Sequence, residues 1–200
     1  MSNLRCEQTI LPGVRMLYPD VFADERGNFR EVYRRDAYAA AGIRDEFVQD
    51  NQSHSIQGVL RGLHYQTRRP QAKLVCVLLG TILDVVVDIR RGSPTLGRYI
   101  AVEMSDRNRR QLFVPAGYAH GFCVLSAEAD VLYKCSDVYD PGGEGGVLWS
   151  DPALAIPWPT PTPRLSPKDR IYPRLADIPP HLLPAWTPAD GEVTRITRDH

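Results

Sequence analysis

Short apolar runs, separated by glycine, proline and polar turn residues, fill the middle of this chain. They cover residues 73–79, 82–89, 98–104, 111–114, 121–125 and 131–138. Runs of this length that recur about every 8–12 residues are typical of an all-β sandwich or barrel. The pattern therefore predicts an all-β fold with these runs as its strands.

One stretch has a helical pattern. Asp36–Ala41 can form a short helix, with Asp36 as its N-cap and Gly42 at its end. No internal repeat or low-complexity linker divides the chain. We therefore expect one domain over residues 1–187, followed by a mobile tail over residues 188–200, which carries few apolar side chains.

The run from Ile82 to Arg90 has two different faces. Alternate residues of a strand point to opposite sides, and the residues at positions 83, 85, 87 and 89 are all aliphatic. The other face carries Asp84 and Asp88 between hydrophobic residues. These carboxylates can line a polar cavity or lie on a solvated face, and the pattern alone favours the solvated face.

The composition changes near the C-terminus. Twelve of the seventeen prolines lie from Pro141 onwards, together with the three tryptophans Trp149, Trp158 and Trp186. Proline fixes φ and removes a backbone donor, so this part of the chain should be extended rather than helical. We expect it to wrap around the barrel with the tryptophans as apolar anchors.

Charge and cysteine content narrow the functional classes. The 24 basic and 24 acidic residues balance, so no overall field favours nucleic acid or an anionic membrane. No apolar stretch reaches the ~20 residues that span a bilayer, and the N-terminus has no signal-peptide pattern. Four scattered cysteines without a C-x-x-C pair are typical of reduced thiols. We therefore expect a cytoplasmic protein that binds neither nucleic acid nor membrane.

Polar residues of several types gather between positions 49 and 73. In Leu60–Gln66, strand alternation places His64 and Gln66 on the same side as Gly62, whose missing side chain leaves room for a ligand. Imidazole is suited to proton transfer near neutral pH, although a structural core histidine fits the same pattern. His64 is therefore a candidate base.

Two further residues carry suitable groups. His120 follows a proline–glycine turn, so it should open the next strand at the barrel rim, where a structural role is the favoured interpretation. Tyr133 shares a strand face with Val131 and Cys135 and can point inward with its hydroxyl as a polar group. Without other information, the pattern favours a position for Tyr133 in the hydrophobic core.

The sequence lacks the common metal and cofactor motifs. The histidines never occur at ligand spacing, and the positions two before and two after His64 are Gly62 and Gln66. No glycine-rich dinucleotide loop, P-loop or serine nucleophile elbow occurs. We therefore expect neither a metal nor a cofactor.

Taken together, these segments resemble the dTDP-4-dehydrorhamnose 3,5-epimerase family. The most specific match is Leu60–Gln66 (LRGLHYQ), and the resemblance extends from about Pro12 to Leu175. It implies a metal-free jelly-roll β-barrel of cupin type, with a few short helices and a proline-rich C-terminal wrap. It also implies a homodimer in which an N-terminal strand segment of each subunit crosses to the partner.

The resemblance also implies roles for individual residues. His64 resembles the base of the family, and Asp169 resembles the carboxylate that orients it. Tyr133 resembles the acid on the opposite face of the sugar, and Lys73 resembles the residue that stabilises the enolate. The other matches resemble residues that bind a dTDP-linked sugar: Phe22 (near the nucleotide base), Arg26, Glu31, Gln49, Asn51, Arg61, His120, Glu144 and Lys168.

These residue types suit the implied conversion of dTDP-4-dehydro-6-deoxyglucose to dTDP-4-dehydro-L-rhamnose. The C4 ketone acidifies the hydrogens on C3 and C5, because the carbanion delocalises onto oxygen. Inversion then requires a base and an acid on opposite faces of the ring. It also requires positive charge at the enolate oxygen, and no redox or metal cofactor.

Small departures from the family pattern leave alternatives open. Asn28 stands where an aromatic residue is usual, Ala72 replaces a common glycine, and the chain beyond Asp177 is longer than a minimal member. A monofunctional 3- or 5-epimerase, or a ketoisomerase acting on a related sugar, would use much the same residues. A silent sugar-nucleotide-binding module would lack the base or the acid, and a cupin oxygenase would contain a metal.

Overall fold

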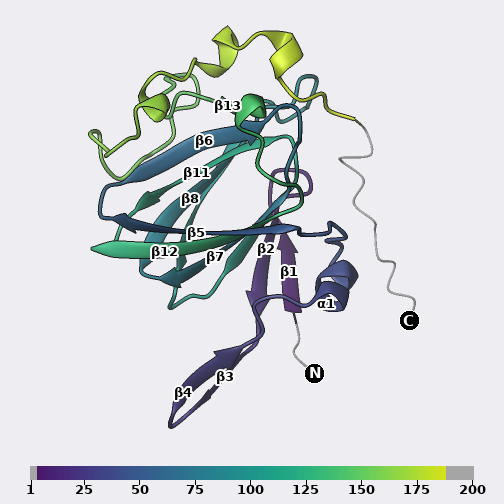
Figure 1. Ribbon diagram of the computed structural model, residues 1–200, viewed down its shortest axis with the longest axis vertical. Helices are drawn as coiled ribbons and strands as arrows, with labels where there is room; N and C mark the ends of the chain where they lie inside the picture. Colours follow the sequence, from purple (N-terminus) through teal and green to yellow (C-terminus); the bar gives the residue numbers. More distant parts are fainter. Residues whose placement is uncertain (1–3, 188–200) are drawn as a thin grey trace.

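Two antiparallel β-sheets face each other in the computed structural model of the protein, which describes residues 4–187 (Figure 1). One sheet has six strands in the order β1-β2-β10-β7-β12-β5, and the other has five in the order β13-β6-β11-β8-β9. A separate two-stranded hairpin is formed by β3 and β4. The result is the expected jelly-roll barrel of cupin type.

The strands of the six-stranded sheet are β1 (Leu4–Gln8), β2 (Arg15–Pro19), β10 (Gln111–Val114), β7 (Lys73–Leu79), β12 (Glu128–Cys135) and β5 (Gln49–Ile56). Those of the five-stranded sheet are β13 (Glu144–Gly146), β6 (Leu60–Gln66), β11 (Tyr118–Val124), β8 (Thr81–Asp88) and β9 (Tyr99–Ser105). The hairpin consists of β3 (Val21–Asp24) and β4 (Gly27–Arg30), and the helices are α1 (Arg35–Ala40) and the 3-10 turns η1 (Pro141–Gly143), η2 (Lys168–Arg170), η3 (Leu175–Asp177) and η4 (Pro180–Leu182).

Every predicted strand exists: β7 and β10 have the predicted bounds, β8 and β9 are displaced by one residue, and β11 and β12 are displaced further. β11 begins three residues before the predicted start, and β12 spans Glu128–Cys135 rather than residues 131–138. The short helix was also predicted correctly, but Asp36 lies in its first turn and Arg34 occupies the N-cap position. Gly42 follows the helix with φ +84°, a conformation that favours glycine.

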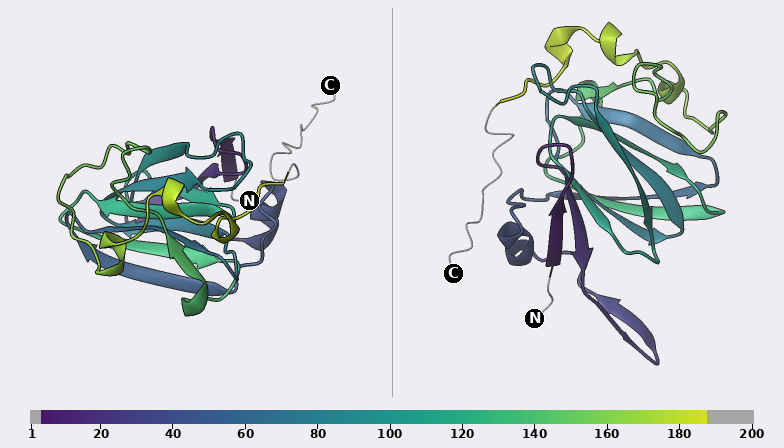
Figure 2. Two further views of the ribbon diagram at one scale, coloured as in Figure 1. Left: turned by 90° about the horizontal axis from the view of Figure 1, so that it is seen from above. Right: turned by 180° about the vertical axis from the view of Figure 1, so that it is seen from behind.

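The main core lies between the two sheets. β-branched residues dominate it, because they pack well on a pleated surface: Val75 and Val77 of β7 meet Ile82 and Val86 of β8. A second cluster lies on the outer face of the six-stranded sheet, where Tyr38 of α1 packs over the strands. Figure 2 shows α1 and the β3–β4 hairpin outside the barrel.

The prediction that Asp84 and Asp88 lie on a solvated face is wrong. Both residues of β8 are fully buried. Asp84 contacts His120, whereas Asp88 forms an ion pair of 2.7 Å with Arg90 and accepts hydrogen bonds from Ser93 and Thr95. Buried charges are stable only when paired in this way, and both faces of β8 are covered.

The C-terminal segment covers the outer face of the five-stranded sheet, as expected for a proline-rich wrap (Figure 1). Leu154 and Ile178 are buried there against Val85 and Val87, and Trp158 packs beside them. Residues 188–200 lie outside the described part of the chain, so the mobile tail stays a prediction. Within residues 4–187, no helix is long and apolar enough to cross a bilayer.

Candidate active site

A cavity of about 390 Å³ lies between the two sheets. Its volume is in the range of pockets that hold small organic ligands. Ten of the thirteen residues predicted for the site line it: Gln49, Asn51, Arg61, His64, Lys73, His120, Tyr133, Glu144, Lys168 and Asp169. Residues far apart in the sequence thus meet in one polar site.

His64 of β6 is oriented by a carboxylate. Its Nε2 lies 2.6 Å from Oδ1 of Asp169 in η2, and the Ser166 hydroxyl donates to the other oxygen at 2.8 Å. Burial works to raise the pKa of Asp169, but the hydrogen bond and charge of His64 outweigh it and lower the pKa overall. The ionised carboxylate can only accept, so Nε2 carries the proton and Nδ1 holds the free lone pair.

The alternation predicted along β6 is interrupted. His64 pairs with His120 of β11, but Arg61 pairs with Phe122, so β6 has one residue more than β11 in this stretch. Gly62 lies against β11 here, where a Cβ would come within 2.5 Å of Gly121 Cα. Arg61, rather than Gly62, therefore lines the cavity together with His64, so the predicted shared face is confirmed for His64 and Gln66 and wrong for Gly62.

Tyr133 and Lys73 reach the cavity from the opposite sheet. Tyr133 lies on β12 and Lys73 at the start of β7, so both face His64 across the gap between the sheets. Burial is the main cause that raises the pKa of Tyr133, so its phenol stays protonated and can donate a proton. Burial lowers the pKa of Lys73, while the charges of Cys135, Asp84 and Glu144 act against this shift.

His120 is not at the rim of the barrel, as predicted, but in the middle of β11. It is 7% exposed, and its Nε2 lies 2.9 and 3.0 Å from the two carboxylate oxygens of Asp84. The strand begins at Tyr118, directly after the proline–glycine turn, so His120 is its third residue rather than its first. A second imidazole–carboxylate pair thus lies beside His64.

The cations of the cavity differ in their partners. Lys168 Nζ binds Glu144 at 2.5 Å, and Tyr139 donates to the same carboxylate at 2.9 Å. Burial on its own would raise the pKa of Glu144, but these two hydrogen bonds lower it overall. Arg61 binds the Ser55 hydroxyl and a backbone carbonyl, with no carboxylate partner among residues 4–187. Its guanidinium is therefore available to an anion.

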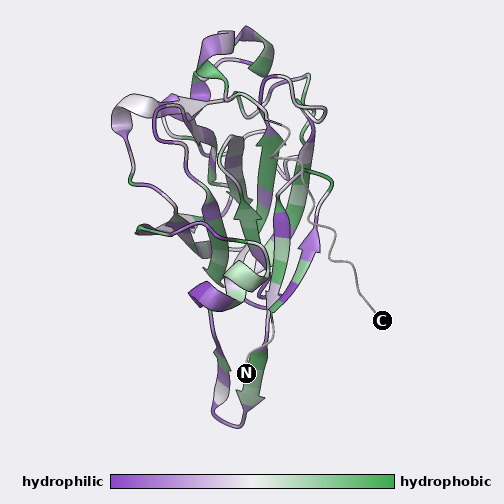
Figure 3. Ribbon diagram, turned by 90° about the vertical axis from the view of Figure 1, so that its right-hand side faces the viewer, coloured by the Kyte–Doolittle hydropathy of each residue, from purple (hydrophilic) through white to green (hydrophobic). Residues whose placement is uncertain are grey.

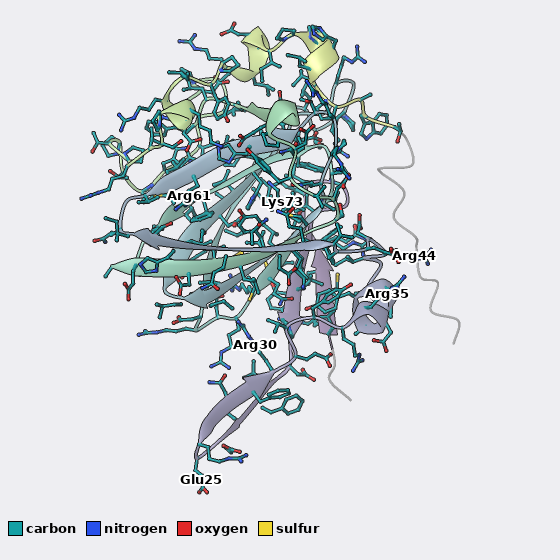
Figure 4. The ribbon with its side chains drawn as sticks, in the orientation of Figure 1. Glu25, Arg30, Arg35, Arg44, Arg61 and Lys73 are labelled. Atoms are coloured by element: carbon teal, nitrogen blue, oxygen red, sulfur yellow. The ribbon has the colours of Figure 1, made fainter. Side chains whose placement is uncertain are left out.

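Three predicted residues lie away from the cavity. Phe22 and Arg26 belong to the β3–β4 hairpin, which extends away from the barrel (Figure 3). Phe22 is 52% exposed, and the Arg26 side chain is 84% exposed and binds Asp24 of its own hairpin. Glu31 contacts Arg34 at 3.4 Å, beyond the end of β4. Figure 4 shows Arg61 and Lys73 in the barrel and Glu25 at the far tip of the hairpin.

Comparison with known proteins identifies the family of this chain. The profile of the family described as dTDP-4-dehydrorhamnose 3,5-epimerase matches residues 8–177. The chain belongs to this family. An epimerase of that description from Methanothermobacter thermautotrophicus is 44% identical over 185 residues, which cover 91% of this chain and all of the relative.

Two other proteins are also similar to this chain. One from Neisseria gonorrhoeae is 53% identical over 163 residues, or 80% of this chain, but the chain spans only 49% of that relative's length. The crystal structure of a dTDP-6-deoxy-D-glucose-3,5-epimerase from Legionella pneumophila, in complex with dTDP-4-keto-L-rhamnose, has a TM-score of 0.90 and 46% identity. The alignment covers 92% of this chain and 100% of that one.

Several residues in or beside this cavity were not predicted from the sequence. Tyr139 binds Glu144, Ser166 supports Asp169, and Asp84 holds His120. Only Asp84 gave a signal, as a carboxylate within an apolar strand. Among the described residues, no three His, Cys, Asp or Glu side chains gather as a metal site requires, and the absence of a metal stays a prediction.

Proposed function

We propose that this protein epimerises a dTDP-4-keto-6-deoxyhexose at C3 and C5, giving dTDP-4-dehydro-L-rhamnose. The observation that carries the proposal is the opposition of His64 and Tyr133, which line one cavity from facing sheets. Epimerisation beside a ketone needs a base on one face of the ring and an acid on the other. Product analysis by NMR after incubation with dTDP-4-keto-6-deoxyglucose tests this function.

The first step is proton abstraction by His64. Nδ1 takes the proton from C3 or C5, and the C–H electron pair moves through the adjacent carbon to the ketone oxygen, forming an enolate. Asp169, 2.6 Å from Nε2, stabilises the imidazolium that results. The ammonium of Lys73 makes no hydrogen bond or ion pair with residues 4–187, so it can bind the enolate oxygen.

The second step is protonation from the other face. Tyr133 transfers its phenolic proton to the carbanion centre, which inverts the configuration and leaves a phenolate. The imidazolium proton and the phenolate then exchange with water, so the enzyme returns to its initial state. No electrons leave the substrate, so the reaction requires no oxidant or reductant, and Lys73 supplies the positive charge at the enolate oxygen.

The remaining polar residues suit the diphosphate and the nucleoside. Arg61 has no carboxylate partner in the described chain, and Lys168 can shift from Glu144 to a phosphate. Gln49 and Asn51 of β5 present amide groups to the cavity, and His120 completes the set. These contacts are part of the proposal. It also includes a single domain over residues 1–187 and a cytoplasmic location, where free cysteines such as Cys76 and Cys123 stay reduced.

A 3-epimerase is the second candidate. A relative described as dTDP-4-dehydrorhamnose 3-epimerase, from Streptomyces niveus, is 44% identical over 162 residues. The same base and acid serve one centre or two, so the position of inversion in the product distinguishes the two functions.

The alkaline limb of the rate profile tests the role of Lys73. Burial lowers the pKa of Lys73, so its positive charge should be lost as pH rises through a value below the ~10.4 of free lysine. The raised pKa of Tyr133 keeps the phenol protonated over the same interval. We expect kcat to fall on this limb as the ammonium that stabilises the enolate disappears.

Lys73→Arg provides the matched comparison. A guanidinium stays charged beyond pH ~12, so the variant should lose the limb, even if its maximum rate is lower. Measuring kcat between about pH 7 and 10.5 gives both profiles. An alkaline limb at the same pH in both proteins would assign the titration to another group.

The proposal includes a homodimer in which each cavity is completed by the partner's hairpin. Two observations support it. Although Asn28 and Arg30 of β4 hydrogen-bond to their own barrel, the hairpin aromatics Phe22 and Phe29 are 52% and 69% exposed. The predicted ligands Arg26 and Glu31 also lie outside the cavity of their own chain. An exposed two-stranded hairpin is marginally stable alone, and a second subunit would cover it.

Mixing two inactive variants tests the exchange of hairpins. His64→Ala removes the base from its own cavity, whereas Arg26→Ala impairs the partner's cavity. A mixed dimer then has one cavity with His64 and an intact partner Arg26. Random subunit exchange should therefore restore up to about 25% of wild-type activity, since half the dimers are mixed and each has one complete site.

The control is each variant refolded alone, with buffer in place of the second variant. Activity assays after co-refolding, with sedimentation to establish the dimer, report the result. A mixture no more active than the sum of its parts would show that Arg26 serves its own chain or neither.

A further inference from the structure

Two polar atoms in the cavity are buried without a partner. Among residues 4–187, three buried side-chain oxygen or nitrogen atoms have no hydrogen bond: Ser53 Oγ, Gln66 Oε1 and Trp186 Nε1. Ser53 and Gln66 both line the active-site cavity. Folded proteins rarely leave such atoms unpaired, so their concentration in one cavity points to a ligand that supplies the partners.

Gln66 is the more informative of the two. A serine hydroxyl can donate or accept, whereas Oε1 of an amide only accepts, so its missing partner is a donor. Gln66 is 8% exposed and is the last residue of β6, two positions beyond His64. Its backbone pairs with Glu144 of β13, and Gln66, Glu144 and His64 line the same cavity.

The chemistry of the substrate limits what this donor is. The diphosphate and the ketone of a dTDP-4-keto-6-deoxyhexose carry only acceptor oxygens at neutral pH. The donors of the nucleoside, the thymine N3–H and the deoxyribose hydroxyl, are separated from the reacting ring by the diphosphate. The sugar ring carries two donors, the hydroxyls on C2 and C3. Gln66 lies two residues from the base His64 and therefore close to the sugar ring. A ring hydroxyl is thus the donor from which Gln66 Oε1 can accept a hydrogen bond.

We propose that Gln66 is a sugar-binding residue whose Oε1 accepts a hydrogen bond from a ring hydroxyl. The proposal rests on the function given above and adds a contact that orients the hexose ring against His64. A site built to bind a hydroxyl discriminates against analogues that lack it, because the buried acceptor is then left unpaired. Gln66 thereby favours hydroxylated rings over deoxy rings.

Binding measurements separate this contact from catalysis. Gln66→Met keeps the side-chain length and removes the acceptor. The dissociation constants of dTDP and dTDP-6-deoxyglucose are measured by calorimetry for the wild type and the variant. We expect dTDP to bind equally well, and the sugar nucleotide to bind about tenfold more weakly to the variant, as for loss of one hydrogen bond. Gln52→Met, on the exposed face of β5, is the matched control and should change neither.

Two further comparisons complete the test. Gln66→Glu retains acceptor oxygens and should bind the sugar nucleotide within about threefold of the wild type. Analogues lacking the C2 or the C3 hydroxyl identify the donor, since Gln66→Met should cause no loss with the analogue that lacks it. Sugar affinity within twofold of the wild type in Gln66→Met, or an equal loss in Gln66→Glu, would overturn the proposal. Turnover by the wild-type protein tests the proposed function separately.

Discussion

His64→Ala should lower kcat by about 10²–10⁴-fold, the usual contribution of a general base. Two histidines of the cavity have a carboxylate on Nε2, but the side chain of His64 is 24% exposed and that of His120 only 8%, so His64 is the more accessible base. Its side chain is 24% exposed, so its loss should leave the fold intact. Steady-state kinetics with dTDP-4-keto-6-deoxyglucose, together with thermal melting, measure both effects.

His181→Ala is the matched control, since this exposed histidine of η4 lies outside the cavity. It should keep the wild-type rate. A His64→Ala protein with a rate within twofold of the wild type would remove His64 from the mechanism and direct attention to His120.

Tyr133→Phe should separate proton exchange from inversion. His64 can still remove a proton and return deuterium from solvent to the same face, so exchange should continue. Inverted product should fall by about 10²–10³-fold, because the opposite face has lost its acid. The Tyr133 hydroxyl makes no hydrogen bond with residues 4–187, so stability should change by less than about 1 kcal/mol.

Deuterium incorporation and product configuration, both followed by NMR in D₂O, give the two rates. Tyr99→Phe removes a hydroxyl that donates to Ala155 on the outside of the barrel, and it should affect neither rate. Equal losses of exchange and inversion in Tyr133→Phe would contradict the division of labour. Full inversion would assign the acid role to water or another residue.

The strands that pack in the core were predictable, and the polar edge strand was not. β7 and β10 have the predicted bounds, because continuous runs of apolar residues mark them, and most of these residues, such as Val75 and Leu112, are buried. β5 reads QDNQSHSI, with no apolar periodicity. One of its faces lines the polar cavity and the other is exposed, so no hydrophobic pattern marks this strand.

The polar residues of β8 show why a strand pattern cannot identify a cavity. Two carboxylates four residues apart, such as Asp84 and Asp88, give the same sequence pattern whether they face water or a buried partner. Asp84 is satisfied by His120, 36 residues away, and only the fold brings them together. Asp88 is satisfied by Arg90, two residues along the chain, which local sequence did contain.

The site was predicted by the motif context rather than by residue patterns. Residues such as His64 and Tyr133 had structural interpretations that fitted the sequence equally well. The extra residue in β6 brought Arg61 onto the cavity side, which alternation could not indicate. The hairpin residues Phe22 and Arg26 lie outside the cavity of their own chain, and only the proposed dimer would bring them to a cavity.

The position of deuterium in the product shows directly which carbons the protein epimerises. The wild-type protein is incubated with dTDP-4-keto-6-deoxyglucose in D₂O, and the product is examined by NMR for configuration and label. We expect deuterium at both C3 and C5 and the L-rhamno configuration. Label and inversion at C3 alone would identify a 3-epimerase, and a substrate recovered without deuterium at either carbon would contradict the proposed function.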